Sequence, residues 1–202
     1  MAKKRSGKTD SEGVVGVTEH GNSAILVTLS AGPTLLDRRK VDLTDDLPTH
    51  PYHHEGSWAV GRYRDSPWSR DITLEEAIAL VEEVHAAADV GARRHLADLA
   101  QALSARITGI AIRECPGLPE TIEARIRDNR AQTFADTVMY RMALATAAEE
   151  RGWTVHWYDR DEVFDRAGDL VGRDANGAIA ELGRAAGPPW QAKHKLAAAA
   201  AM

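Results

Sequence analysis

A nearly unbroken apolar run, Ile107–Ile112, is the feature that most constrains how this chain folds. Apolar residues that do not alternate with polar ones are typical of a β-strand that is buried on both faces. Such a strand needs a covering layer on each side of its sheet, because neither face is left for water. The sequence therefore predicts an α/β fold.

The residues before this run predict three strands joined by tight turns. Val14–Glu19, Ser23–Ser30 and Thr34–Leu43 are rich in apolar and β-branched residues, and the segments between them, 20–22 and 31–33, carry glycine, asparagine and proline. Consecutive strands connected in this way form an antiparallel meander.

The remaining segments alternate between helix and strand. Thr73 and Glu76 match a capping box at a helix start, and Gly152 is typical of a residue that ends a helix. Helices are expected at Thr73–Ala88, 92–103, Gln132–Arg151, Asp161–Ala167, Ala178–Ala185 and Gln191–Ala201, and a fifth strand at Trp153–Tyr158. The predicted fold is a mixed five-stranded sheet, an antiparallel three-strand meander followed by parallel strands, flanked by helices.

The 202 residues are enough for one sizeable core, but the chain is short for two full domains. We expect a single domain over residues 13–202. Residues 1–12 are expected to be a disordered tail. The basic residues of this tail are Lys3, Lys4, Arg5 and Lys8.

Composition narrows the classes of function. The sequence has no run of about 18 apolar residues, so no contact with a membrane is expected. One cysteine, Cys115, excludes an internal disulfide and is typical of a cytoplasmic protein. No Gly-x-x-x-x-Gly-Lys-Ser/Thr loop occurs, so no nucleotide cofactor is expected. A net charge of -5 argues against a strong general nucleic-acid binder, although an enzyme with a local basic groove stays compatible with it.

Two glutamates stand at the ends of predicted strands. Glu19 ends the first strand, and Glu114 follows the apolar run. If these strands are neighbours, the two carboxylates lie close enough to share a metal ion or an active-site water. Such a pair is typical of metal-dependent phosphodiester cleavage. The alternative is that both are solvated strand ends.

The segment His50-Pro51-Tyr52-His53-His54-Glu55 gathers three histidines and a carboxylate. These side chains are ligands for Zn²⁺ or another transition metal, but the spacing is too compact for one ion to use all of them. A second interpretation makes His53 or His54 a general base, because an unperturbed histidine has a pKa of ~6.5. A third is a polar loop that closes over the sheet.

Charged residues also mark the helix predicted at 132–151. Asp136 and Tyr140 lie one turn apart with Arg141 beside them, which indicates a structural Asp136–Arg141 pair. Three arginines precede the helix, at Arg125, Arg127 and Arg130. They are suited to bind phosphate or to form a solvated charged face.

In the order of its elements the chain resembles the RNase H-like superfamily, and its second half resembles RuvC-type Holliday-junction resolvases. The segments that carry the resemblance are Gly16-Val17-Thr18, Ala111-Ile112-Arg113-Glu114, 155–163 and the alanine-rich 188–199. Residues 44–104, a loop and helices, are then an insertion that the resemblance does not match.

The resemblance implies a RuvC-like, Mg²⁺- or Mn²⁺-dependent nuclease or nucleic-acid-processing protein, with nucleic acid as partner and a homodimer by analogy. Together with the two clusters above, it gives the expected metal ligands as Glu19, Glu114, His194 and Glu55. The expected catalytic residues are Glu19, Glu114, His194, His53 and His54.

Three positions depart from the resolvase pattern. Thr18 and Arg113 stand where the resolvases carry acidic residues, so that Glu19 and Glu114 each come one residue late, and Ala197 replaces a further acidic residue. A shift of one residue on a strand turns a side chain to the other face unless a bulge intervenes. The alternative function is therefore a catalytically degenerate RNase H-like binding or assembly module.

Overall fold

The computed structural model describes residues 11–172 and 174–202. The basic residues of the predicted tail lie outside the described residues. Within the described part, no helix is both long and apolar enough to cross a membrane.

The core of the fold is a five-stranded sheet in the order β3-β2-β1-β4-β5. The strands are β1 (Glu12–His20), β2 (Ser23–Ser30), β3 (Leu35–Asp42), β4 (Arg106–Arg113) and β5 (Thr154–Tyr158). β1, β2 and β3 pair antiparallel, and β4 is parallel to both β1 and β5. The predicted mixed sheet, a meander followed by parallel strands, is confirmed.

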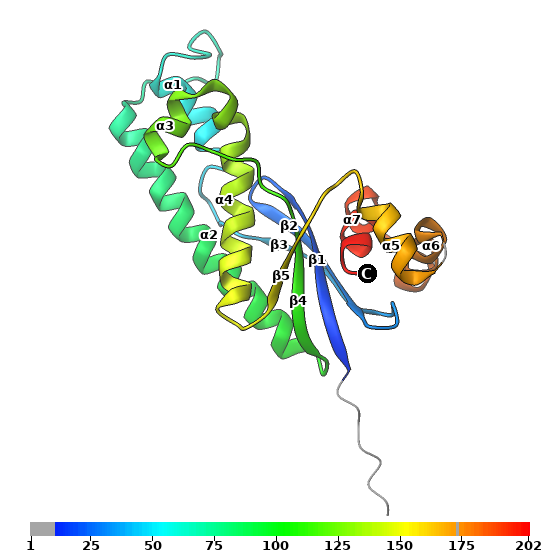
Figure 1. Cartoon of the computed structure of the whole chain (residues 1–202). Helices are drawn as coiled ribbons and strands as arrows, with labels where there is room; N and C mark the ends of the chain where they lie inside the picture. The colour runs from blue at the N-terminus through cyan, green and yellow to red at the C-terminus, as the bar shows by residue number, and fades with distance from the viewer. Residues whose placement is uncertain (1–10, 173) are drawn as a thin grey trace, which may run out of the picture.

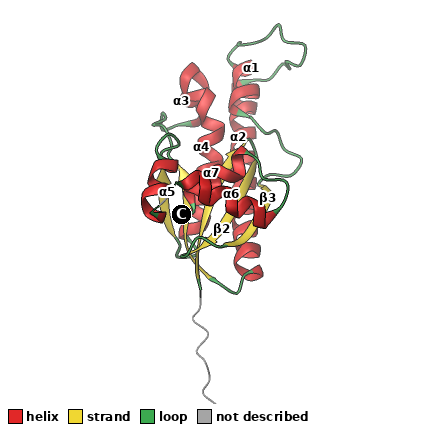
Figure 2. Cartoon of the chain, turned by 90° about the vertical axis from the view of Figure 1, so that its right-hand side faces the viewer, coloured by secondary structure: helices red, strands yellow, loops and turns green. Residues whose placement is uncertain are grey.

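Helices cover both faces of the sheet, as the apolar run of β4 requires (Figures 1 and 2). On one face lie α2 (Leu74–Ala102), α3 (Ile122–Arg127), α4 (Asn129–Glu149), a π-helical turn η1 (Tyr52–Gly56) and the short α1 (Ser57–Ala59). On the other face lie α5 (Val163–Val171), α6 (Ala175–Ala186) and α7 (Ala192–Ala200). Two separate apolar cores result, one on each side of the sheet.

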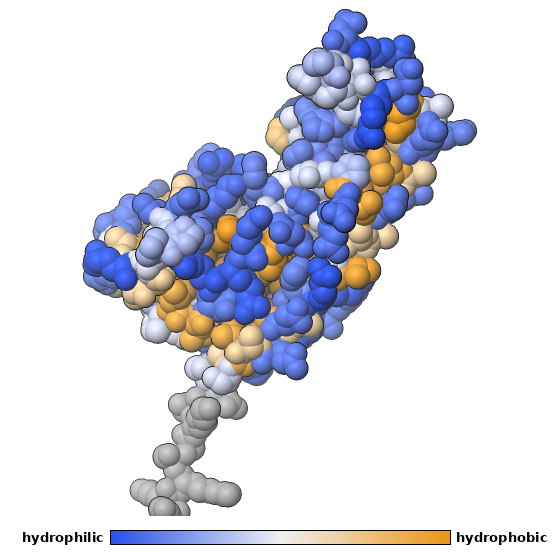
Figure 3. All heavy atoms as spheres, turned by 180° about the vertical axis from the view of Figure 1, so that it is seen from behind, coloured by the Kyte–Doolittle hydropathy of each residue, from blue (hydrophilic) through white to orange (hydrophobic). Residues whose placement is uncertain are grey.

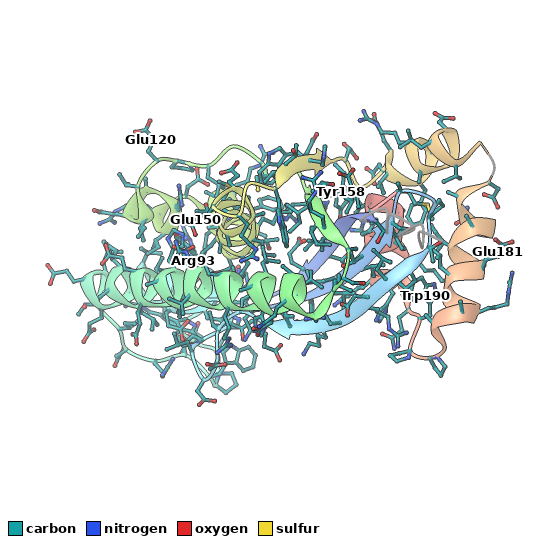
Figure 4. The ribbon with its side chains drawn as sticks, turned by 90° about the horizontal axis from the view of Figure 1, so that it is seen from below. Arg93, Glu120, Glu150, Tyr158, Glu181 and Trp190 are labelled. Carbon is teal, nitrogen blue, oxygen red and sulfur yellow. The ribbon has the colours of Figure 1, made fainter. Side chains whose placement is uncertain are left out.

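The helices α2 and α4 project beyond one end of the sheet and carry α1 and α3 there (Figure 1). Seen from behind, the projecting end is mainly hydrophilic, with hydrophobic residues between the polar ones (Figure 3). At the other end of the pair, Arg93 on α2 faces Glu150 after α4, with an Nε–Oε2 distance of 2.7 Å (Figure 4).

The sequence predicts two helices where the structure has the single helix α2. The capping box at its start is confirmed, since Glu76 N donates to Thr73 Oγ1 over 3.2 Å and Thr73 N donates to Glu76 Oε2 over 2.8 Å. The helix runs without interruption through residues 89–91, between the two predicted segments. A Cβ on Gly91 would lie 2.0 Å from the carbonyl oxygen of Leu43, so this glycine lets the helix pass close to the chain after β3.

The alanine-rich helix α7 lies directly on β1. A Cβ on Gly16 would lie 1.8 Å from the carbonyl oxygen of Ala197 and 2.8 Å from the backbone nitrogen of Ala201. Small residues on both sides therefore set the distance between helix and sheet, in a core that has no room for another methyl group.

Because of this contact, two glycine substitutions should differ strongly in their effect on the stability of the protein. Gly16→Ala should destabilise the protein by about 1–3 kcal/mol, because the methyl group collides with the backbone of α7. Gly32→Ala is the matched control, because a Cβ there meets nothing within 4 Å. Both variants lose a glycine from the unfolded chain, so the difference between their urea-denaturation midpoints isolates the collision. Equal midpoints would contradict the close packing.

Candidate functional site at the strand ends

The carboxyl ends of β1 and β4 and the turn after β5 border one pocket of about 620 Å³. In open α/β sheets, this edge is where ligands usually bind. The charged residues and histidines of its lining are Glu19, His20, His50, Arg113, Glu114, Arg141, Asp159, Arg160 and Asp161. The predicted strand-end glutamates thus share one pocket.

Glu19 is engaged by Arg141 of α4. Its Oε1 accepts from Arg141 Nε over 2.8 Å and from Nη2 over 2.5 Å. The third guanidinium nitrogen, Nη1, donates to the carbonyl oxygen of Glu114 over 2.6 Å. One side chain therefore ties the ends of β1 and β4 to α4.

The direction of the Glu19 side chain follows from the alternation of β1. Val15 and Val17 pack into the core beneath α2 and α4, and Glu19 comes two residues later on the same face. Thr18 points to the opposite face and is buried. The one-residue offset from the resolvase pattern thus has a structural effect: the acidic side chain meets α4, and a hydroxyl group stands on the side of α7.

Burial makes each side chain of this ion pair dependent on the other. The side chain of Arg141 is 5% exposed and that of Glu19 is 6% exposed. A buried carboxylate has lost its hydration, so it depends on the guanidinium for compensation. The second carboxylate oxygen of Glu19, Oε2, is also buried and has no hydrogen-bond partner among the described residues.

Glu114 differs from Glu19 in its surroundings. It follows β4 directly and is exposed, and its backbone nitrogen donates to the carbonyl oxygen of Tyr158 over 3.0 Å. Its backbone is therefore fixed between β5 and Arg141, while the carboxylate stands at the pocket.

Asp159 and Asp161 line the same pocket but are not among the site residues that the sequence predicts. Asp159 directly follows β5, and its Oδ1 accepts from the backbone nitrogen of Asp161 over 2.6 Å. The signal was present in the sequence, because Asp159 follows a predicted strand in the same way as Glu114 follows the apolar run.

His194 lies away from this pocket, although it was predicted to join the two glutamates. It stands in the first turn of α7, on the opposite side of the sheet from α4. Its Nδ1 accepts from the backbone nitrogen of Gln191 over 3.2 Å, and its ring stacks on Trp190 with centroids 5.8 Å apart. Burial and the nearby Arg38 lower its pKa. The structure gives His194 a role in capping α7 and does not bring it to Glu19.

The three histidines of the segment are neighbours, with ring centroids 5.6 Å apart for His50 and His54 and 5.4 Å apart for His53 and His54. His50 lines the strand-end pocket, whereas His53 and His54 line a pocket beside Trp58. Glu55 is buried and accepts from Arg70 Nη2 over 2.6 Å. The predicted members of the site are therefore not assembled around one centre.

Asp136 holds this segment in place. Its carboxylate accepts from the backbone nitrogens of Tyr52 over 2.9 Å and His53 over 3.0 Å. Gln132 donates to the carbonyl oxygens of the same two residues. The predicted Asp136–Arg141 pair is wrong, because Arg141 binds Glu19 and Asp136 instead caps the π-helical turn.

The arginines before α4 also have partners in the chain. Arg125 donates to the carbonyl oxygen of Pro119 over 2.7 Å, and Arg127 pairs with Glu123 at the same distance. Arg130 is exposed at the start of α4. Two of the three side chains that were considered for phosphate binding thus stabilise the local structure of α3.

The geometry does not fit the expected Mg²⁺ or Mn²⁺ ion. These ions need several oxygen ligands around one point. Here the guanidinium of Arg141 binds the carboxylate of Glu19, and its positive charge opposes a cation. Among the described residues, no group of three or more histidine, cysteine, aspartate or glutamate side chains is placed to hold a metal.

Comparisons with known proteins give a likeness of structure and no match in sequence. No family model and no curated protein matches the chain. A solved structure of Thermus thermophilus RuvC in complex with a Holliday-junction substrate has a TM-score of 0.48 at 14% identity, over 94% of this chain and 90% of that one. A second Thermus thermophilus RuvC structure has a TM-score of 0.44 at 15% identity, with the same coverage. Likenesses of this strength carry no argument about activity, substrate or partner.

Replacing Arg141 should strongly lower the stability of the protein, because its ion pair with Glu19 is buried. Arg141→Met should destabilise the protein by about 3–5 kcal/mol, because it leaves the Glu19 carboxylate buried without its partner. The double variant Glu19→Leu/Arg141→Met should be more stable than Arg141→Met alone, since it removes the orphaned charge. Urea denaturation at neutral pH measures both.

Arg93→Met is the control for this experiment. The Arg93–Glu150 pair has similar geometry, but both side chains are nearly half exposed. Its loss should cost far less, because water replaces the partner. Equal destabilisation by Arg93→Met and Arg141→Met would contradict the importance of burial.

The stability of the protein should depend on pH through the carboxyl group of Asp136. Burial raises the pKa of its carboxyl group to about 7, more than the hydrogen bonds from Tyr52 and His53 lower it. Because the folded pKa lies above the unfolded one, this group stabilises the fold at acidic pH, and the contribution is lost as the pH rises from about 4 through 7.

Asp136→Asn should remove this contribution. The difference in unfolding free energy between wild type and variant should therefore fall as the pH rises through this window. Taking the difference is necessary because His50 and His53, whose pKa values are lowered chiefly by burial, act in the opposite direction. A pH-independent difference would show that the carboxyl group does not titrate in this way.

Proposed function

We propose that this chain is a catalytically degenerate RNase H-like module that works by binding and does not hydrolyse phosphodiesters. The observation that carries the proposal is the buried ion pair between Glu19 and Arg141. In two-metal hydrolysis, carboxylates at the strand ends hold the ions that activate water and stabilise the leaving oxygen. Here a fixed guanidinium takes the place next to the β1 carboxylate.

The positions around the pair support the same proposal. Thr18 supplies a hydroxyl group on the face of α7, where a carboxylate would bind a metal much more strongly. Ala197 packs its backbone against Gly16, and His194 is used within α7. The side of the sheet that faces α7 is thus closed by packing.

A RuvC-like nuclease is the second candidate. It is favoured by the exposed carboxylates of Glu114, Asp159 and Asp161, which stand at the same pocket. Exposed carboxylates are free to move toward an ion that a substrate brings with it. Glu114 is the residue that distinguishes the two candidates, because it is a site residue predicted from the sequence and it lines this pocket.

A cleavage assay tests the proposal. Purified protein is incubated with Mg²⁺ or Mn²⁺ and with branched, double-stranded and single-stranded nucleic acids, and the products are separated by gel electrophoresis. We expect no cleavage by the wild type and no difference in Glu114→Gln. Metal-dependent cleavage that disappears in Glu114→Gln would overturn the proposal and establish the nuclease.

A further inference from the structure

Five aromatic or histidine rings line a second pocket at the projecting end of the molecule. The pocket has a volume of about 290 Å³, and Ser66 is its remaining lining residue. The rings belong to His53, His54, Trp58, Tyr63 and Trp68. His53 and His54, candidates for a metal site or for general bases on the sequence alone, thus lie in aromatic surroundings.

The floor of this pocket is fixed. Trp58 is 7% exposed, and the ring of His54 stacks on it with centroids 5.9 Å apart and planes at 13°. His53 follows at 5.4 Å from His54, and its backbone nitrogen is bound by Asp136. The guanidinium of Arg70 lies 5.6 Å from the centre of the Trp58 ring. These rings therefore keep their positions without a ligand.

The outer wall is exposed. Tyr63 is 57% exposed and Trp68 is 66% exposed, although each buries a large apolar area when it finds a partner. Tyr63 has a φ of 55°, and within the described residues it is the one residue other than glycine with a positive φ. The segment holds this conformation by bonds from Ser66 N to Tyr63 O over 3.1 Å and from Ser69 Oγ to Arg64 O over 2.7 Å. Such backbone strain is found mainly at functional positions.

The surroundings of the pocket carry more positive than negative charge, in contrast to the chain as a whole. The segments 61–71 and 121–130 contain six arginines and four carboxylates, and one further carboxylate, Glu55, pairs with Arg70, whereas the net charge of the chain is -5. Arg62 joins the two segments, because it donates to the carbonyl oxygen of Ile126 over 2.8 Å and to that of Arg127 over 2.5 Å. Arg64 adjoins Tyr63 in the chain, and Gln132, two residues after Arg130, donates to the carbonyl oxygen of His53, so both exposed arginines lie on segments that border the aromatic pocket.

We propose that this pocket binds single-stranded nucleic acid. Unstacked bases would stack on Tyr63 and Trp68, and the backbone phosphates would contact Arg64 and Arg130. Exposed aromatic rings beside arginines are the combination that binds single strands, since every base offers a face for stacking and the phosphates need cations. The inference rests on the proposed binding function and names its partner.

The charge around the pocket distinguishes single-stranded nucleic acid from the other ligands that aromatic pockets bind. A methylated ammonium group binds to the faces of aromatic rings, but the guanidinium of Arg70 already lies beside the Trp58 ring, and its positive charge opposes a second cation there. A proline-rich peptide also docks on aromatic rings, but it gains nothing from the excess of arginine. A polyanion with flat aromatic groups uses both features.

Binding of fluorescently labelled single-stranded DNA and RNA is measured by anisotropy, in EDTA so that cleavage does not interfere. Trp68→Ala should weaken binding about 5- to 150-fold, the effect of losing one stacked base. Tyr63→Asn should act similarly, because asparagine tolerates a positive φ and the variant keeps the backbone. Arg64→Ala should lower the dependence of binding on salt concentration.

The matched control is Trp157→Ala. Trp157 is also an exposed tryptophan, 40% exposed, but it lies on β5 outside the pocket. Its removal should leave binding unchanged. Circular dichroism on all variants verifies that the fold is kept.

Four results would overturn the inference: no binding of single strands by the wild type, no loss in Trp68→Ala and Tyr63→Asn, an equal loss in Trp157→Ala, or preferential binding of a proline-rich peptide. None of these alone affects the proposed lack of hydrolysis, which the cleavage assay tests. Conversely, cleavage in the presence of Mg²⁺ would refute the proposed function, and the EDTA experiment would still report whether the aromatic pocket binds single strands.

Discussion

The buried ion pair between Glu19 and Arg141 determines what the strand ends of this protein can do. A carboxylate at 6% exposure has lost most of its hydration and needs a partner, and the partner comes from α4, 122 residues later in the chain. The same guanidinium holds the carbonyl oxygen of Glu114. Because one cation fixes the ends of β1 and β4 together, it gives the pocket its shape and also neutralises the carboxylate that a metal would require.

The sequence predicts the sheet well because its signals are local. The apolar run in β4, the turns between the first three strands and the capping box at Thr73 each depend on residues close in the chain. Long-range contacts explain the errors. Gly91 lies between the two predicted helical segments, and its close contact with the backbone of Leu43 is the reason for the glycine. The turn η1 is held by Asp136 and Gln132, about 80 residues away, so no local pattern reveals it.

The candidate site could be predicted in part for the same reason. That strand ends meet at one edge of a sheet is a rule of topology, and it placed Glu19 and Glu114 at one pocket. Applied equally to β5, it would also have found Asp159. The side chain that faces a strand end depends on tertiary packing. The sequence therefore predicted His194 beside the two glutamates, whereas Arg141 lies there in the structure. The alternation of side chains along β1 turns Glu19 toward α4 and away from α7, so the neighbour of Glu19 comes from α4.

The two pockets are connected through Asp136. The segment that it caps carries His50, at the strand-end pocket, and His53, at the aromatic pocket. His50 Nδ1 lies 3.9 Å from the Asp136 carboxylate, whose pKa burial raises to about 7. Because a protonated carboxyl group accepts hydrogen bonds less strongly than a carboxylate, the hold on the segment depends on the charge of Asp136. Because the ring of His50 lies 5.6 Å from that of His54, which lies beside His53 in the aromatic pocket, the segment that Asp136 holds reaches from the strand-end pocket to the aromatic pocket.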